Sequence, residues 1–112
     1  MGQIHPEKLE GKSLAGIQSY IKLALSARGF DDETVAQKFM LLMEETGELA
    51  QAARKHARVK VADDSTAKHK ENLSDEVGDV LILVLDICNK LGINAETAII
   101  QKEIKNSKRN WQ

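Results

Sequence analysis

FMLLMEETGELAQAA, residues 39–53, is a strongly apolar segment with three glutamates, of which Glu45 and Glu48 lie three residues apart. A second apolar segment, DEVGDVLILVL at residues 75–85, repeats this arrangement with Glu76 and Asp79. Residues three apart share one face of an α-helix. The two segments therefore predict two helices, each of which points a pair of carboxylates in one direction.

The rest of the chain predicts an all-α protein of four helices. It contains one proline and few aromatic residues, and no strand-like alternation lies beside a hairpin turn signal. The first helix is expected after the N-cap Ser13 and ends at Gly29, and the second opens at Asp31 or Asp32. The third is expected at about residues 71–91 and ends at Gly92, and the fourth begins at the N-cap Asn94.

Helical periodicity also predicts which residues face inward. The first helix is expected to bury Leu14, Ile17, Ile21 and Leu25, and the second has an apolar stripe of Val35, Phe39, Leu42, Thr46, Leu49 and Ala53. Residues 1–12 are expected to form a loose arm. Residues 59–70 lose the apolar periodicity, so they are expected to form the longest connection.

Composition limits the classes of function. With 112 residues the chain has room for one domain, residues 1–112. Its 16 basic and 17 acidic residues give a net charge of -1, which predicts neither a nucleic-acid polymer nor an anionic membrane as partner. Its single cysteine, Cys88, excludes intrachain disulfides, and its longest apolar run is far too short to span a bilayer. We therefore expect a soluble cytoplasmic protein.

The acidic residues lie where a helix normally buries apolar side chains. At 100° per residue, Glu45 projects into the apolar arc of its helix and Glu76 projects between Leu83 and Ile87. Gly47 and Gly78 in the same segments suggest a close approach of the two helices. Four converging carboxylates repel one another unless they bind cations, and oxygen ligands favour Mg²⁺ or Mn²⁺ with a phosphate-bearing ligand.

The fourth helix and the apolar run at residues 80–85 suggest two further contacts. Lys102, Asn106 and Arg109 are spaced at i, i+4 and i+7, so they can present phosphate-binding groups on one face; a solvated basic helix end explains them equally well. Residues 80–85 are apolar around nearly the whole helix circumference. We expect a second copy of the chain to cover part of this surface.

Taken together, Glu44-Glu45-Thr46-Gly47-Glu48-Leu49, Glu76-Val77-Gly78-Asp79 and Lys102-x-x-x-Asn106-x-x-Arg109 resemble the MazG-like members of the all-α nucleoside triphosphate pyrophosphohydrolase superfamily. The resemblance covers about residues 14–109. It implies a four-helix MazG-like bundle completed by homo-oligomerisation, as a homodimer or a homotetramer.

The resemblance also implies an activity and a site. The reaction is Mg²⁺-dependent cleavage of a nucleoside triphosphate between its α and β phosphates, which yields a monophosphate and pyrophosphate. Glu45, Glu48, Glu76 and Asp79 match the metal ligands, and Lys102, Asn106 and Arg109 match residues that contact phosphate and sugar. Glu45 or Glu48 is the candidate for orienting or deprotonating the attacking water.

The substrate, the presence of activity and the residues of a base pocket stay open at this point. The substrate can instead be phosphoribosyl-ATP, or the chain can be a non-catalytic helical oligomerisation module. A di-iron carboxylate bundle is unlike this sequence, because no glutamate has a histidine three residues later. Tyr20, Phe30, Phe39 and Trp111 are candidates for a base pocket, although aromatic residues at helical spacing usually belong to a core.

Overall fold

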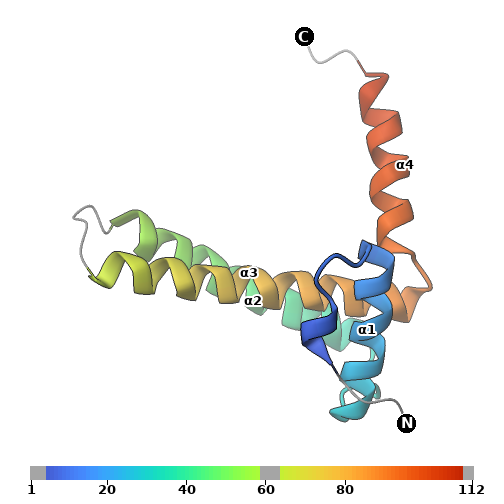
Figure 1. Cartoon of the computed structure of the whole chain (residues 1–112), viewed down its shortest axis with the longest axis horizontal. Coiled ribbons are helices and arrows are strands. Elements are labelled where there is room, and N and C mark those ends of the chain that lie inside the picture. Colours follow the sequence, from blue (N-terminus) through green and yellow to red (C-terminus); the bar gives the residue numbers. More distant parts are fainter. Residues whose placement is uncertain (1–4, 59–63, 110–112) are drawn as a thin grey trace. The chain divides into compact units, whose positions relative to one another are not determined.

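The computed structural model describes residues 5–58 and 64–109, apart from the side chains of residues 58 and 64–70. In this part of the chain a 3₁₀-helix, η1 (Pro6–Lys8), precedes four α-helices: α1 (Leu14–Ala27), α2 (Val35–Arg58), α3 (Asp64–Leu91) and α4 (Ala95–Ser107) (Figure 1). No strand occurs in these ranges. The all-α prediction is confirmed, although part of the expected loose arm forms η1.

The capping residues of α1 and α4 follow the prediction. The Ser13 hydroxyl accepts a hydrogen bond from the Gly16 amide at 3.0 Å, and Asn94 accepts one from the Thr97 amide, also at 3.0 Å. These bonds satisfy amides that have no partner within the helix. Gly29 and Gly92 adopt φ values of +81° and +70°, the left-handed conformation that ends α1 and α3.

The starts of α2 and α3 differ from the prediction. Thr34, rather than Asp31 or Asp32, caps α2: its hydroxyl accepts from the Gln37 amide at 3.1 Å, and Gln37 Oε1 accepts from the Thr34 amide at 2.8 Å. This reciprocal pair is a capping box, which satisfies two amides at once. Helix α3 begins at Asp64, so residues 64–70 of the expected connection are helical. Adding residues to an existing helix is easier than starting a new one. The rest of that connection, residues 59–63, lies outside the described residues.

The described chain divides into two compact units. The first contains residues 5–32 and 85–109, and the second contains residues 33–58 and 64–84. Helix α1 contacts α4 in the first unit, whose core contains Ile21, Leu85 and Ala95. The residues packed against this core are Leu14, Ile17, Tyr20, Leu25 and Cys88. All four inward residues predicted for the first helix therefore belong to this core or pack on it.

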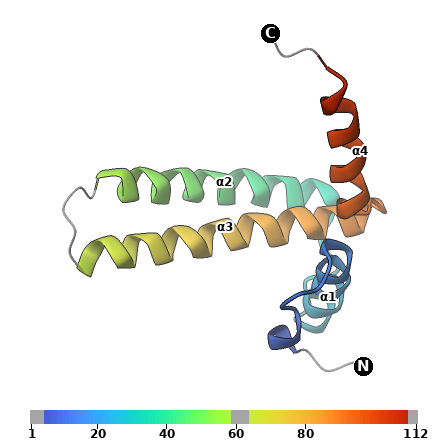
Figure 2. The same ribbon diagram turned by 45° about the horizontal axis from the view of Figure 1, so that its top comes forward.

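In the second unit, α2 and the first part of α3 lie side by side and run in opposite directions (Figures 1 and 2). Apart from Leu41, the less exposed residues of α2 recur at alternating intervals of three and four: Val35, Lys38, Leu42, Glu45, Leu49, Ala52 and His56. On α3 they include Leu73, Glu76, Val80 and Leu83. This spacing is typical of helices that pack along a narrow seam.

The seam corrects the stripe predicted for α2. Phe39, Thr46 and Ala53 are exposed, and Lys38, Glu45 and Ala52 take the less exposed positions beside them. The apolar arc of α2 is wider than one helix can cover, so part of it faces away from the seam.

No helix within the described ranges is both long and apolar enough to cross a membrane.

Candidate metal centre

Three of the four predicted acids converge between α2 and α3 of the second unit. Glu45, Glu76 and Asp79 each offer one carboxylate oxygen, and these three oxygens all lie within 4.8 Å of one another. Glu45 and Glu76 are half-buried, whereas Asp79 is exposed. The seam accounts for this convergence, because Glu45 and Glu76 occupy seam positions on helices that lie side by side.

Two of these carboxylates carry an oxygen that the protein itself does not satisfy. The Oε2 atoms of Glu45 and Glu76 are buried, and neither has a hydrogen-bond partner among the described residues. A buried polar atom without a partner destabilises the folded state, so such an atom at a site calls for an explanation. A cation bound between the two carboxylates would offset the unfavourable burial of their charge.

The electrostatic environment of Glu45 and Glu76 also favours a bound cation. Burial raises the pKa of Glu45, and the neighbouring charges of Glu48, Asp79 and Glu76 raise it further. The pKa of Glu76 is also raised, first by burial and then by Glu48, Asp79 and Asp75. Both shifts show that the metal-free site disfavours its own negative charge, which a divalent cation would offset.

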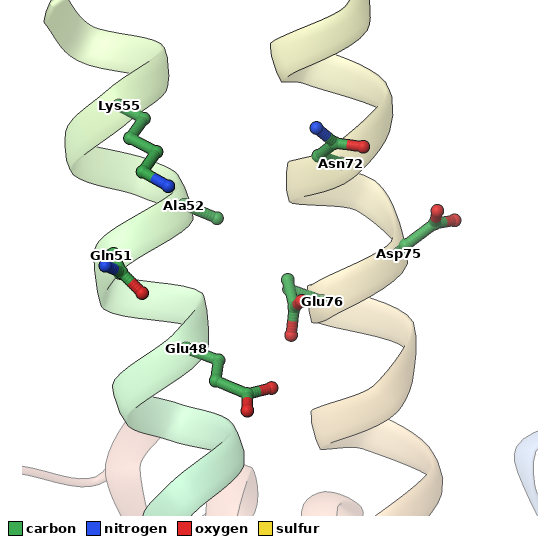
Figure 3. A pocket seen from close by; sticks show the side chains of 7 residues that line it. All are labelled: Glu48, Gln51, Ala52, Lys55, Asn72, Asp75 and Glu76. Carbon is green, nitrogen blue, oxygen red and sulfur yellow. The ribbon is translucent and has the colours of Figure 1, made fainter.

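Glu48, the fourth predicted ligand, lies beside this group but outside the three-oxygen cluster. It is exposed, and its charge acts on both Glu45 and Glu76. Figure 3 shows the Glu48 carboxylate turned from α2 toward α3, on the side where Glu76 lies. Glu48 is thus placed either to complete the ligand set or to contact a water molecule bound there.

The donor set fits a hard divalent cation. All the converging atoms are carboxylate oxygens, the ligands that Mg²⁺ and Mn²⁺ prefer over nitrogen or sulfur. Mg²⁺ binds oxygens at about 2.1 Å, so two ligand atoms of one ion lie at most about 4 Å apart. Small side-chain rotations would bring the three oxygens into that range.

A pocket of about 470 Å³ lies next to the acids in the same unit. It is lined by Glu48, Gln51, Ala52, Lys55, Asn72, Asp75 and Glu76 (Figure 3). Two of these, Glu48 and Glu76, are among the predicted metal ligands. The pocket therefore gives a polar ligand a place beside the candidate metal centre.

Comparison with known proteins assigns this arrangement to a family. Residues 33–111 match the MazG nucleotide pyrophosphohydrolase domain, a match that includes both acidic couplets and the pocket. The chain belongs to the MazG family. This membership supports nucleotide pyrophosphohydrolysis as the general class of activity and agrees with the family resemblance of the motifs.

One curated relative adds weaker support. The chain is 29% identical over 100 residues to YvdC of Bacillus subtilis (strain 168), an uncharacterized protein; the match covers 86% of this chain and 94% of YvdC. No solved structure gives a significant match to the chain. The family assignment therefore rests on the MazG domain itself.

The basic residues predicted to contact substrate belong to the other unit. Lys102 and Asn106 lie on α4, and Arg109 follows the C-cap residue Lys108, so it lies beyond the helix. The helical spacing used to place Arg109 on the same face therefore does not reach it. That these three residues and the acids of the MazG site contact one nucleotide stays a prediction.

Two other expectations about the site need correction or closer description. A Cβ atom built at Gly47 or Gly78 would meet nothing within 4 Å, so the two glycines do not mark a close approach of α2 and α3. Among the aromatic candidates, Tyr20 packs on the core of the first unit, while Phe30 and Phe39 are about half exposed. Trp111 lies outside the described residues.

Sequence reasoning missed four polar residues that line the pocket: Gln51, Lys55, Asn72 and Asp75, which directly precedes Glu76. Their spacing from Glu48 and Glu76 along the helices was a signal that could have identified them. Gln51 and Lys55 follow Glu48 by three and seven residues, and Asn72 precedes Glu76 by four. Helical residues at these intervals share a face, so the acids could have been used to find them.

Proposed function

We propose that this MazG-family protein is a Mg²⁺-dependent nucleoside triphosphate pyrophosphohydrolase, with residues 1–112 working as one functional domain. The observation that carries the proposal is the convergence of Glu45, Glu76 and Asp79, together with the two buried oxygens that have no partner. An inert helical module would gain nothing from carboxylates placed in a seam, where they oppose folding.

The reaction adds water across the bond between the α and β phosphates. An oxygen–phosphorus bond forms to water, the anhydride bond breaks, and the products are a nucleoside monophosphate and pyrophosphate. Glu48 or Glu45 orients the water and accepts its proton. Glu45, Glu48, Glu76 and Asp79 would hold Mg²⁺ or Mn²⁺, which would supply positive charge for the phosphates and make the attacking water more acidic. Lys102, Asn106 and Arg109 bind phosphate and sugar in this proposal.

The protein is further proposed to act as a homodimer or homotetramer in the cytoplasm. Support comes from large apolar side chains that α2 and α3 expose in the second unit: Phe39, Met40, Met43, Val77, Leu81, Ile82 and Val84. Burial of such surface against a second copy is favourable by roughly 25 cal/mol per Å². Light scattering tests this part, and a monomer at micromolar concentration would contradict it.

The activity is tested by measuring pyrophosphate release from a panel of ribonucleoside, deoxyribonucleoside and modified nucleoside triphosphates, with and without Mg²⁺. We expect release from at least one triphosphate, and we expect EDTA to abolish it. Phosphoribosyl-ATP belongs in the panel, because its exclusive hydrolysis would identify that alternative substrate. No release from any substrate, with Mg²⁺ bound or not, would favour the non-catalytic module and overturn the proposal.

A further inference from the structure

The polar pocket beside the acids has a single basic residue among the seven described residues that line it, Lys55. We propose that Lys55 binds the terminal phosphate of the substrate and makes the enzyme selective for nucleoside triphosphates over diphosphates. This inference rests on the proposed function and adds a specificity-determining residue to it.

The chemistry of the pocket suits phosphate rather than a nucleobase. Among the seven described lining residues, Ala52 is the only apolar one and none is aromatic. A base requires an apolar or aromatic surface to pack against, which this lining does not offer. An ammonium group and the amides of Gln51 and Asn72 can instead donate hydrogen bonds to phosphate oxygens.

The negative charge of the lining explains why a phosphate group in this pocket would need Lys55. Glu48, Asp75 and Glu76 contribute three carboxylates to the pocket against one ammonium. A phosphate that extends from the acids into this pocket would meet a negative surface in the absence of Lys55. No carboxylate among the described side chains forms an ion pair with Lys55, so its ammonium is available to a ligand.

Lys55 and Glu48 line the pocket from different turns of α2. Lys55 follows Glu48 by seven residues, which is about 10 Å along a helix. Side chains on a helix lean toward its N-terminus, and Figure 3 shows Lys55 reaching back along α2 toward the turn of Ala52. The Asn72 amide lies over α3 with its nitrogen on the side of α2, whereas Asp75 points away from α2. A phosphate chain anchored at one end by a cation on the acids would therefore have Lys55 within its reach at the other end.

The test compares two substitutions that change net charge equally. Lys55→Gln removes the ammonium in the pocket, and Arg54→Gln removes the neighbouring basic group, which lines a different hollow with Gly47, Ala50 and Gln51. Binding of pyrophosphate, the product that carries the terminal phosphate, is measured by calorimetry in excess Mg²⁺. We expect Lys55→Gln to weaken it about tenfold or more, since a hydrogen bond to a charged group contributes that much.

Further measurements complete the test. Lys55→Arg should keep affinity for pyrophosphate within a few-fold, and Arg54→Gln should leave it unchanged. In the activity assay, the ratio of kcat/KM for triphosphate to that for diphosphate should fall about tenfold in Lys55→Gln. Circular dichroism establishes that each variant is folded.

Several results would overturn the inference: equal weakening by Lys55→Gln and Arg54→Gln, no weakening by either, or no pyrophosphate binding to the wild-type protein. Failure of the proposed function is a separate result. If pyrophosphate binds in a Lys55-dependent way but no nucleotide is hydrolysed, the phosphate site stands and the enzymatic activity falls.

Discussion

Glu45 of α2 and Glu76 of α3 bring carboxylate oxygens within 4.8 Å of each other, and each keeps its Oε2 atom buried without a hydrogen-bond partner among the described residues. Two like charges in such a position oppose folding of the metal-free protein. The seam between the helices is therefore less stable here than an apolar seam would be. A cation bound between the two carboxylates would offset this loss of stability.

Divalent cations are expected to stabilise the protein. A ligand that binds only the folded state stabilises it by RT ln(1 + [L]/Kd), about 2.7 kcal/mol at a concentration of 100 Kd. Millimolar Mg²⁺ or Mn²⁺ should therefore raise the melting temperature, measured by differential scanning calorimetry. Asp79→Asn should remove most of this increase. Glu71→Gln, an exposed substitution on the same helix with the same change in charge, should retain it.

The stability of the metal-free protein should fall as pH rises through the raised pKa values of Glu45 and Glu76. Between the ordinary value of 4.5 and the raised values, the folded state binds more protons than the unfolded state. The stabilising contribution is thus complete below 4.5 and is lost above the folded-state pKa. Melting temperatures from pH 4.5 to 8 in EDTA measure this slope for the wild type and for Glu45→Gln. Identical slopes would contradict the assignment.

Removing charge from the site should abolish catalysis without unfolding the chain. Glu48→Gln and Asp79→Asn keep the shape of the side chain, and each should lower the rate of pyrophosphate release at least about a hundredfold. Helicity, followed by circular dichroism at 222 nm, should stay at the wild-type value. Turnover retained by both variants would show that the site lies elsewhere.

Gly47→Ala should stabilise the isolated chain. A Cβ at this position meets nothing within 4 Å, and alanine is favoured over glycine in a helix interior by about 0.5–1 kcal/mol. Urea denaturation at a protein concentration too low for association measures the effect. Destabilisation under these conditions would mean that another part of the chain packs against Gly47.

The first unit depends on a buried amide, Gln18. Its Nε2 donates to Asn89 Oδ1 at 3.0 Å and to the Ile93 carbonyl at 2.7 Å, and its Oε1 accepts from the Ala95 amide at 2.8 Å. Gln18→Ala leaves these groups without their partner, so it should lower the free energy of unfolding by about 2–3 kcal/mol in urea titrations. Ser19→Ala, an exposed neighbour, should change it by less than about 0.5 kcal/mol. Equal effects would contradict this role.

The local structure followed closely from the sequence where a short motif decides it. Ser13 and Asn94 were identified as N-caps, and Gly29 and Gly92 as helix ends, because each depends on a few neighbouring residues. The start of α2 was wrong because two aspartates before it looked like caps, while the reciprocal bonds of Thr34 and Gln37 satisfy two amides at once. A threonine followed three residues later by a glutamine is the sequence pattern of a capping box, and it competes with the two aspartates as a signal for the helix start.

The seam could not be predicted with the same accuracy. Phe39 and Lys38 both lie near the apolar arc of α2, and hydrophobicity favours Phe39 for the inside. The structure places Lys38 there, in an ion pair with Glu33 at 3.4 Å, and leaves Phe39 exposed. Which residues face the seam depends on how α2 lies against α3, and this relation is absent from either helix alone.

By itself, the sequence determined the all-helical class, the family and the placement of two acidic pairs on two helices. Helical spacing and short motifs are local properties, so a single segment contains them completely. Only the tertiary structure decided that Glu45, Glu76 and Asp79 form the tight group, with Glu48 beside it and Lys55 in the adjoining pocket. The reason is physical: distances between side chains of different helices depend on the packing of α2 against α3, which periodicity within one helix does not encode.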